Sequence, residues 1–100
     1  NVYVSSVNHG FDAKTYIDAM PAAQIRQIHL AGHEDHGDYI IDTHDHDVCE
    51  PVWALYEYTV QRLGLLPTLI ERDDQLPDFA TLMRERNRAH ALLLANEVPA

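Results

Sequence analysis

Hydrophobic and polar residues alternate along two short stretches of the chain, and this alternation predicts β-strands. In the stretch 25–30, Ile28 and Leu30 fall on one face of an extended backbone and His29 falls on the other. The stretch 68–72 repeats the pattern. In each stretch one polar side chain interrupts the pattern close to the C-terminal end, and these two residues are His29 and Glu71.

A helical period is clearest between Pro51 and Gly64. Its apolar residues recur at spacings of four, four and three, and they are Val52, Tyr56, Val60 and Leu63. Proline suits the first turn of a helix and glycine suits its C-terminal cap. Two more helices are predicted, one from the N-cap Asp12 to Met20 and one from about Pro77 to Ala95. The last helix is expected to pack through Phe79, Leu82, Met83 and Leu93.

The remaining segments complete an alternating order of strands and helices. Residues 1–7 are rich in β-branched and aromatic side chains and are predicted to end a strand. Residues 32–48 are predicted to form a long ordered loop with a short extended piece at 39–41. Alternating strands and helices indicate βαβ units with parallel pairing. We therefore predict an α/β fold with about three parallel strands, in one partial domain that spans residues 1–100.

Composition and charge narrow the range of partners. The chain is 46% hydrophobic and 23% charged, which is typical of a globular domain, and it has a net charge of −9 without a local Lys/Arg cluster. A nucleic-acid partner is therefore not expected. Cys49 is the single cysteine, so neither an intrachain disulfide nor a cysteine-based zinc site is expected. No signal peptide or apolar span is evident, so we expect a cytoplasmic protein with no membrane contact. The chain begins at Asn1 without a methionine, which suggests a processed chain or an excised piece.

Potential metal ligands are concentrated in one segment, IHLAGHEDHGDYIIDTHDHDV. Imidazole and carboxylate donors without thiolate favour iron, manganese or zinc. Asp42 and His44 are separated by one residue, so both side chains emerge on the same face of an extended backbone. His29 and Glu71, at the ends of the two predicted strands, can complete the ligand set. An ionisable group that faces the interior costs free energy unless it is paired or bound to metal, which favours a functional role for both residues.

Other polar residues of the chain have simpler interpretations. Solvated loop positions are the expected role of His36, Asp45, His46 and Asp47. His90 is expected to be structural, and helix packing is the expected role of Trp53, Tyr56 and Tyr58.

Five motifs together resemble a known enzyme family, namely NVYVSSVNHGFD, IRQIHLAGH, IDTHDHDV, PVWALY and PTLIERDD. They are similar to the C-terminal portion of the MbnB-like multinuclear non-haem iron enzymes, whose fold is a TIM (β/α)8 barrel related to that of xylose isomerase. The resemblance implies that this chain is the C-terminal part of such a barrel. It also implies a centre of two or three irons, a partner protein, and a reaction that uses dioxygen to oxidise cysteine in a ribosomally made precursor peptide.

The resemblance also assigns roles to individual residues. His29, Asp42, His44 and Glu71 correspond to iron ligands, and Asp73 corresponds to an acid or base beside the metals. The family brings further His and Glu ligands on earlier strands and an Asp-x-Asn pair, of which Asn1 is interpreted as the remnant. The roles of His9, His33 and Asn1 stay open.

Two rival hypotheses accompany the iron-dependent oxidase. One is a zinc- or manganese-dependent isomerase or hydrolase of a small metabolite, because one fold hosts many chemistries. The other is an inactive metal-binding fragment. Three parallel strands would leave unpaired edges, so the isolated chain is also expected to self-associate.

Overall fold

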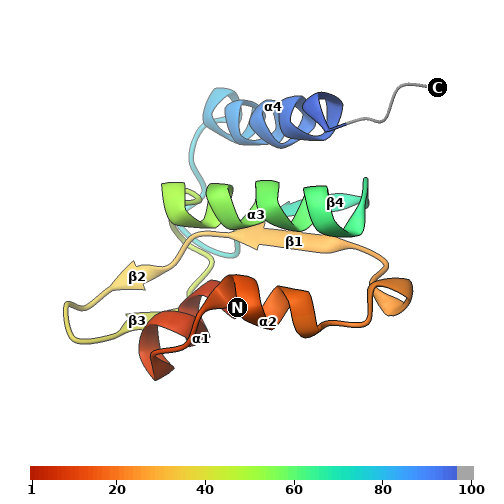
Figure 1. Ribbon diagram of the computed structural model, residues 1–100. Coiled ribbons are helices and arrows are strands. Elements are labelled where there is room, and N and C mark those ends of the chain that lie inside the picture. Colours follow the sequence, from red (N-terminus) through yellow and green to blue (C-terminus); the bar gives the residue numbers. More distant parts are fainter. Residues whose placement is uncertain (97–100) are drawn as a thin grey trace.

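A parallel pair of strands lies at the centre of the computed structural model, which describes residues 1–96 (Figure 1). β1 (Ile28–Ala31) pairs with β4 (Thr68–Glu71), in a register that runs from Ile28 opposite Thr68 to Ala31 opposite Glu71. The connection between the two strands contains α3 (Glu50–Leu63), which makes the unit a βαβ motif. Because the strands are parallel, their carboxyl ends meet at the same edge of the sheet.

The other helices surround this unit. α1 (Val2–His9) and α2 (Ala13–Ala19) contact each other and α3, and a short 3-10 turn, η1 (Ala22–Gln24), leads from α2 towards β1. α4 (Phe79–Ala95) contacts β4 and lies away from α1 and α2 in Figure 1. Among the described helices, none has both the length and the apolar composition that a membrane crossing requires.

The hydrophobic core lies between α3 and one face of the two parallel strands. Its buried members are Leu30, Val48, Trp53, Tyr56, Val60 and Ala89, with Ile28 and Ile70 packed against them. Leu69, on the opposite face of β4, is 50% exposed. The alternation predicted from the sequence is therefore confirmed, and the face that carries His29 and Glu71 is the one turned away from this core.

Helix boundaries agree with the predicted capping signals. The Asp12 carboxylate accepts a hydrogen bond from Lys14 N–H at 3.2 Å and one from the Thr15 hydroxyl at 2.9 Å, which satisfies the start of α2. Gly64 follows α3 with a φ of 92°, a conformation that glycine adopts without steric cost. Helix α3 begins at Glu50, one residue before its predicted start at Pro51.

The prediction of a strand over residues 1–7 is wrong, because this segment forms α1. Gly10 has a left-handed φ of 70°, and the N–H groups of Gly10 and Phe11 donate to Ser6 O at 2.9 and 3.2 Å, which ends the helix. Ser6 is buried. Packing of the segment against its neighbours outweighs the strand preference of its valines, since strand propensity largely reflects context.

The prediction of about three parallel strands also needs correction, since the described residues contain two. Part of the predicted loop forms an antiparallel hairpin, in which β2 (Glu34–Asp35) pairs with β3 (Ile40–Ile41) as a separate sheet. β3 confirms the extended piece predicted at 39–41. β1 begins at Ile28 rather than at residue 25. Ile25 caps η1, with its N–H donating to Ala22 O at 3.2 Å, and the pairing with β4 starts only at Ile28. The result is a mixed α/β structure with a small parallel sheet, compatible with part of a barrel.

Two smaller expectations concern the C-terminal region. Phe79, expected on the packed face of α4, is the first residue of the helix and is 75% exposed. The predicted domain extended to residue 100, and residues 97–100 lie outside the described part of the chain.

Candidate metal centre

Five side chains meet where β1 and β4 end, and they come from three separate segments. They are His29 from β1, Asp42 and His44 from the loop after β3, Glu71 from β4, and Asp73 just beyond it. His29 lies opposite Leu69 and Glu71 lies opposite Ala31, so His29 and Glu71 are diagonal neighbours on one face of the sheet. The Glu71 carboxylate contacts His29 Nδ1 directly.

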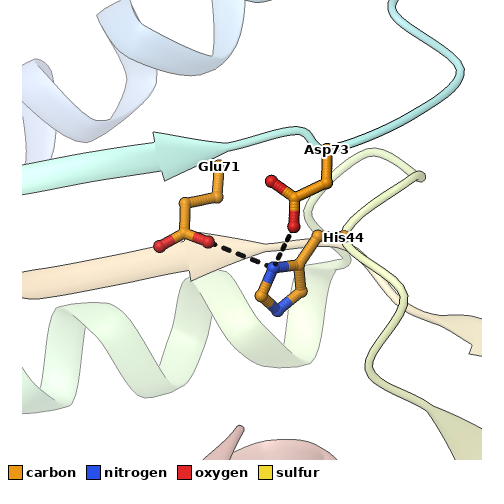
Figure 2. Close-up of side chains that lie close together, drawn as sticks. All are labelled: His44, Glu71 and Asp73. Carbon is orange, nitrogen blue, oxygen red and sulfur yellow. Dashed lines mark hydrogen bonds and ion pairs between the residues drawn. The ribbon is translucent and has the colours of Figure 1, made fainter.

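The imidazole of His44 lies between three carboxylates. Its Nδ1 is 3.1 Å from Glu71 Oε2 and 3.0 Å from Asp73 Oδ2, as Figure 2 shows, and its Nε2 is 2.7 Å from Asp42 Oδ1. The His44 side chain is 19% exposed, whereas that of Asp73 is 65% exposed. The structure therefore brings together all four predicted ligands and the predicted acid or base.

The backbone at His44 is held in an unusual conformation. His44 has a φ of 56°, in the left-handed region that residues other than glycine rarely adopt. Its N–H donates to Gly32 O at 3.2 Å and its carbonyl accepts from Asp73 N–H at 2.7 Å. His44 is thus tied through its backbone to the segments that follow both β1 and β4, which offsets the cost of the conformation.

Gly32 allows the loop to approach the end of β1. A Cβ atom at this position would lie 1.9 Å from His46 O, a backbone atom that cannot move without shifting the loop. Only glycine fits there, for reasons of space rather than of φ. Sequence reasoning missed this role, although a single glycine shortly after a predicted strand is a signal for such an approach.

A buried ion pair fastens the far end of the same loop. Glu85 of α4 accepts from Val48 N–H at 2.7 Å through Oε2, and its Oε1 is 3.4 Å from Arg72 Nη2. Arg72 also contacts the Asp47 carboxylate. The side chains of Arg72 and Glu85 are only 7% and 10% exposed, so the pair joins β4, α4 and the loop inside the protein.

Sequence reasoning missed this pair, although both residues left a signal. Arg72 falls on the same face of the strand as Ile70, which packs against the core. Glu85 interrupts an apolar stripe of α4 between Leu82 and Ala89. A charged residue on a face that should be buried requires a partner.

The donor set and its geometry fit a divalent metal ion. His44 Nε2 is buried and has no hydrogen-bond partner among the described residues, although Asp42 Oδ1 lies 2.7 Å from it. A ring nitrogen and a carboxylate oxygen that face one space without bonding to each other are suited to sharing a cation. In addition, His44, Glu71 and Asp73 each offer a ligand atom within 4.8 Å of the others. Imidazole and carboxylate without thiolate favour iron, manganese or zinc.

The remaining polar residues of the loop are engaged elsewhere. His36 stacks on Tyr39 with 5.1 Å between the ring centroids. Hydrogen bonds from Thr43 and then from His46 hold the pKa of Asp45 below its ordinary value. Local contacts thus account for these side chains. The His46 side chain is 48% exposed, as expected of a solvated position, whereas that of Asp45 is only 12% exposed, so the expectation is wrong for Asp45.

The three residues of open role lie in different surroundings. His33 Nδ1 is 3.9 Å from Cys49 Sγ, and its ring lies 5.6 Å from that of Tyr3. Burial raises the pKa of Tyr3. The amino group of Asn1 is 3.9 Å from Asp42 Oδ2, and His9 is exposed at the end of α1.

Comparisons with known proteins identify relatives along almost the whole chain. The family described as "RiPP precursor modification enzyme MbnB/TglH/ChrH" matches residues 1–94. A UPF0276 protein of Caulobacter sp. strain K31 is 53% identical over 96 residues, which cover 93% of this chain and 35% of that protein. A UPF0276 protein of Acaryochloris marina is 47% identical over 93 residues, covering 93% of this chain and 34% of that protein. No solved structure matches the chain.

The chain spans about a third of the length of these relatives, 35% and 34% of the two proteins. Within that span the similarity includes the segments that carry His29, Asp42, His44, Glu71 and Asp73, because the family match covers residues 1–94. The chain therefore belongs to the family of RiPP precursor modification enzymes MbnB/TglH/ChrH.

Proposed function

We propose that the complete protein is an iron-dependent oxidase that modifies cysteine residues of a ribosomally made precursor peptide with dioxygen. The observation that carries the proposal is the imidazole of His44 among three carboxylates, with a buried ring nitrogen that makes no hydrogen bond. Membership of a family of RiPP modification enzymes supports a peptide as the substrate. A precursor peptide and a partner protein are the proposed partners.

In this proposal His29, Asp42, His44 and Glu71 hold the metal, two or three irons being bound in the complete protein. Their contacts with one another fix the donors before a metal arrives, which lowers the cost of ordering them on binding. Iron, when bound, supplies the electron-transfer chemistry that reaction with dioxygen requires. The chain contributes the ligand geometry and the ordered surroundings.

Asp73 is proposed to move a proton. Its Oδ2 is 3.0 Å from His44 Nδ1, and its side chain is 65% exposed, so an incoming thiol can reach it from solvent. A carboxylate at this position can accept the thiol proton and return it later, as general acid–base catalysis requires. Asp73 also offers a ligand atom within 4.8 Å of those of His44 and Glu71, so in this role its carboxylate stays unbound beside the metal.

The test combines metal analysis with a peptide assay on the full-length protein. His44→Ala is expected to lose most of its iron after anaerobic reconstitution while its helix content stays the same, because a loop ligand contributes little packing. His46→Ala, an exposed histidine of the same loop, is the matched control and should keep its iron. Equal iron content in His44→Ala and the parent protein would contradict the proposal.

The reaction is tested by mass spectrometry of the precursor peptide, with and without dioxygen and the partner protein. Conversion should need iron, dioxygen and the cysteines of the peptide, so a peptide with serine in place of cysteine should stay unmodified. The same donor set also suits zinc or manganese, which supports an isomerase or hydrolase as the second candidate. Activity with zinc or manganese that does not depend on dioxygen would favour that candidate.

A further inference from the structure

One side chain of α1 holds the backbone from which the ligand-bearing loop starts. Asn8 donates through Nδ2 to Ile40 O at 2.8 Å, and its Oδ1 accepts from Ile40 N–H at 2.9 Å. The two residues are 32 positions apart in the sequence. A single carboxamide therefore makes both hydrogen bonds that a neighbouring strand would make with Ile40.

The hairpin explains why these two backbone groups face Asn8. Asp35 lies opposite Ile40, and the next hydrogen bond of the hairpin runs from His36 N–H to Tyr39 O at 3.0 Å. Because bonding alternates along antiparallel strands, the N–H and C=O of Ile40 point away from β2. The Ile40 side chain is buried as well. Ile40 is thus held by β2, by Asn8 and by its own side chain.

The position of Ile40 controls the direction in which the chain reaches the metal centre. Only Ile41 separates Ile40 from Asp42, whose Oδ1 lies 2.7 Å from His44 Nε2. Beyond Asp42 the backbone is held again. Thr43 N–H donates to Ile41 O at 2.9 Å, and His44 N–H donates to Gly32 O at 3.2 Å. The position of Asp42 is therefore set by the hydrogen bonds that hold Ile40 before it and Thr43 and His44 after it.

We propose that Asn8 is a positioning residue of the metal centre, which sets the place of the Asp42 carboxylate by holding the backbone of Ile40. In the described part of the chain, both hydrogen bonds of the Asn8 side chain go to the backbone of Ile40 and neither goes to a ligand side chain. The inference rests on the proposed function, since it assumes that Asp42 binds the metal. Residues that orient metal ligands typically contribute a factor of about 10 to 100 in metal affinity.

The location of Asn8 separates positioning from support of the fold. Asn8 is an exposed residue of α1, so its removal opens no cavity in the core. Alanine is also a better helix former than asparagine. We therefore expect Asn8→Ala to melt close to the temperature of the parent protein while the metal centre loses its order.

The experiment uses the metal-free full-length protein and ferrous iron under anaerobic conditions, with a chromophoric chelator as competitor. Asn8→Ala should bind iron about 10- to 100-fold more weakly. Asn8→Asp keeps the acceptor for Ile40 N–H and loses the donor to Ile40 O, so its loss should be smaller. The control is Asn87→Ala, since Asn87 is an exposed asparagine of α4 that accepts a hydrogen bond from Arg86, and this variant should bind iron normally.

A second measurement does not involve metal. Hydrogen exchange of the metal-free protein should be faster at the amide of Ile40 in Asn8→Ala than in Asn87→Ala, because the acceptor of that amide is gone. If Asn8→Ala does not fold, the same two measurements on Asn8→Asp test the proposal. Iron binding should be weaker than in the parent, and exchange at the amide of Ile40 should be close to that of the parent because the acceptor of this amide is kept.

Each outcome has one meaning. Normal iron affinity in Asn8→Ala together with weakened binding in His44→Ala overturns this inference and leaves the proposed function standing. Normal affinity in His44→Ala overturns the proposed function, and the inference with it. Equal losses in Asn8→Ala and Asn87→Ala would also contradict a positioning role.

Discussion

Gly32 lies where the backbone of residues 46 and 47 crosses the end of β1, and His44 N–H donates to its carbonyl. At the residue scale, the candidate metal centre thus depends on a glycine that provides no ligand. The left-handed φ of 56° at His44 is a second constraint of this kind. Both belong to the backbone, and both decide where the His44 ring lies.

The first prediction concerns the space at Gly32. In Gly32→Ala the added Cβ would meet His46 O, so the loop must move away from β1, and iron affinity should fall strongly. Forcing extra atoms into a packed site also typically costs about 1–3 kcal/mol of stability. Iron titration and urea unfolding of the same sample measure the two effects.

Gly37→Ala is the contrasting variant for this prediction. Gly37 has a φ of 87° in an exposed turn, where a Cβ would have nothing within 4 Å. Alanine there strains the backbone without touching the loop at residue 46, so stability should fall and iron affinity should not. If both variants bound iron equally well, the close approach at Gly32 would not matter for the centre.

At the scale of elements, ion pairs hold α4 against the rest of the fold. One is the buried pair of Arg72 and Glu85, which joins β4 to α4 and to the loop. The other is the exposed pair of Glu50 and Arg88, which joins the start of α3 to α4, with the Arg88 guanidinium 4.7 Å from the centre of the Trp53 ring. Burial makes these two pairs different in energy.

The second prediction is that Glu85→Ala destabilises the protein severely. It would leave Arg72 buried without its closest buried partner and Val48 N–H without an acceptor. Removing one member of a buried pair typically costs about 3–5 kcal/mol, a large part of the 5–15 kcal/mol stability of a typical domain. Urea unfolding measures this loss.

Glu57→Ala serves as the control, because Glu57 is an exposed glutamate of α3 and should change stability by less than about 0.5 kcal/mol. Replacing both members of the buried pair, as in the double variant Arg72→Met with Glu85→Leu, should recover much of the loss. An unfolding midpoint of Glu85→Ala equal to that of the parent would show that the pair contributes nothing.

The third prediction is a pH dependence of the tie between α3 and α4. Arg88 donates to both carboxylate oxygens of Glu50 at 2.7 and 2.6 Å, and these hydrogen bonds hold the pKa of Glu50 below its ordinary value of 4.5. A carboxyl group whose pKa is lower in the folded state adds stability that is fully present above the unfolded pKa. The contribution is lost as the pH falls through the folded pKa.

Glu50→Gln should therefore melt at a lower temperature than the parent at neutral pH. The difference should start to shrink as the pH falls below 4.5, the ordinary pKa of Glu50, and should disappear once the pH is below the pKa of Glu50 in the folded protein. Thermal melting of both proteins over a range of pH values tests this. A difference that stayed constant from about pH 3 to pH 7 would contradict the assignment of the pKa shift to Glu50.

At the scale of the whole molecule, the central sheet has two strands and hence two unpaired edges. Leu69 is half exposed on one face of it, and a cavity of about 280 Å³ lies beside β1, between that strand and α1, α2 and α3. Strand edges next to apolar side chains favour pairing with further strands. The relatives contain additional chain, since the matched segment is 35% of the first of them.

The fourth prediction follows for the 100-residue chain by itself: it should self-associate through its open strand edges or by exchanging an element between copies. Sedimentation across a dilution series measures this. Leu69→Lys should weaken the association, because it places a charge on the exposed face. A compact monomer that melts cooperatively at micromolar concentration would contradict the prediction.

The sequence by itself determined which face of each element is apolar and where polar side chains interrupt the pattern. Period-two alternation identified the strand positions of His29 and Glu71, and spacings of three and four identified α3, because these periods are properties of the local backbone. The close spacing of Asp42 and His44 pointed to the same site. That these residues bind iron stays a prediction, while their convergence in space is now observed.

Only the tertiary structure decided the features that depend on contacts between distant segments. Residues 2–9 form a helix against the local strand preference, the bonds from Asn8 to Ile40 span 32 positions, and Gly32 is needed because another segment crosses it. Arg72 and Glu85 are charged residues on faces that the sequence predicts to be buried, which indicates that each needs a partner, but the pattern does not show that they pair with each other. Local periodicity reports the direction of a side chain, whereas its neighbour across the fold is set by packing of the whole chain.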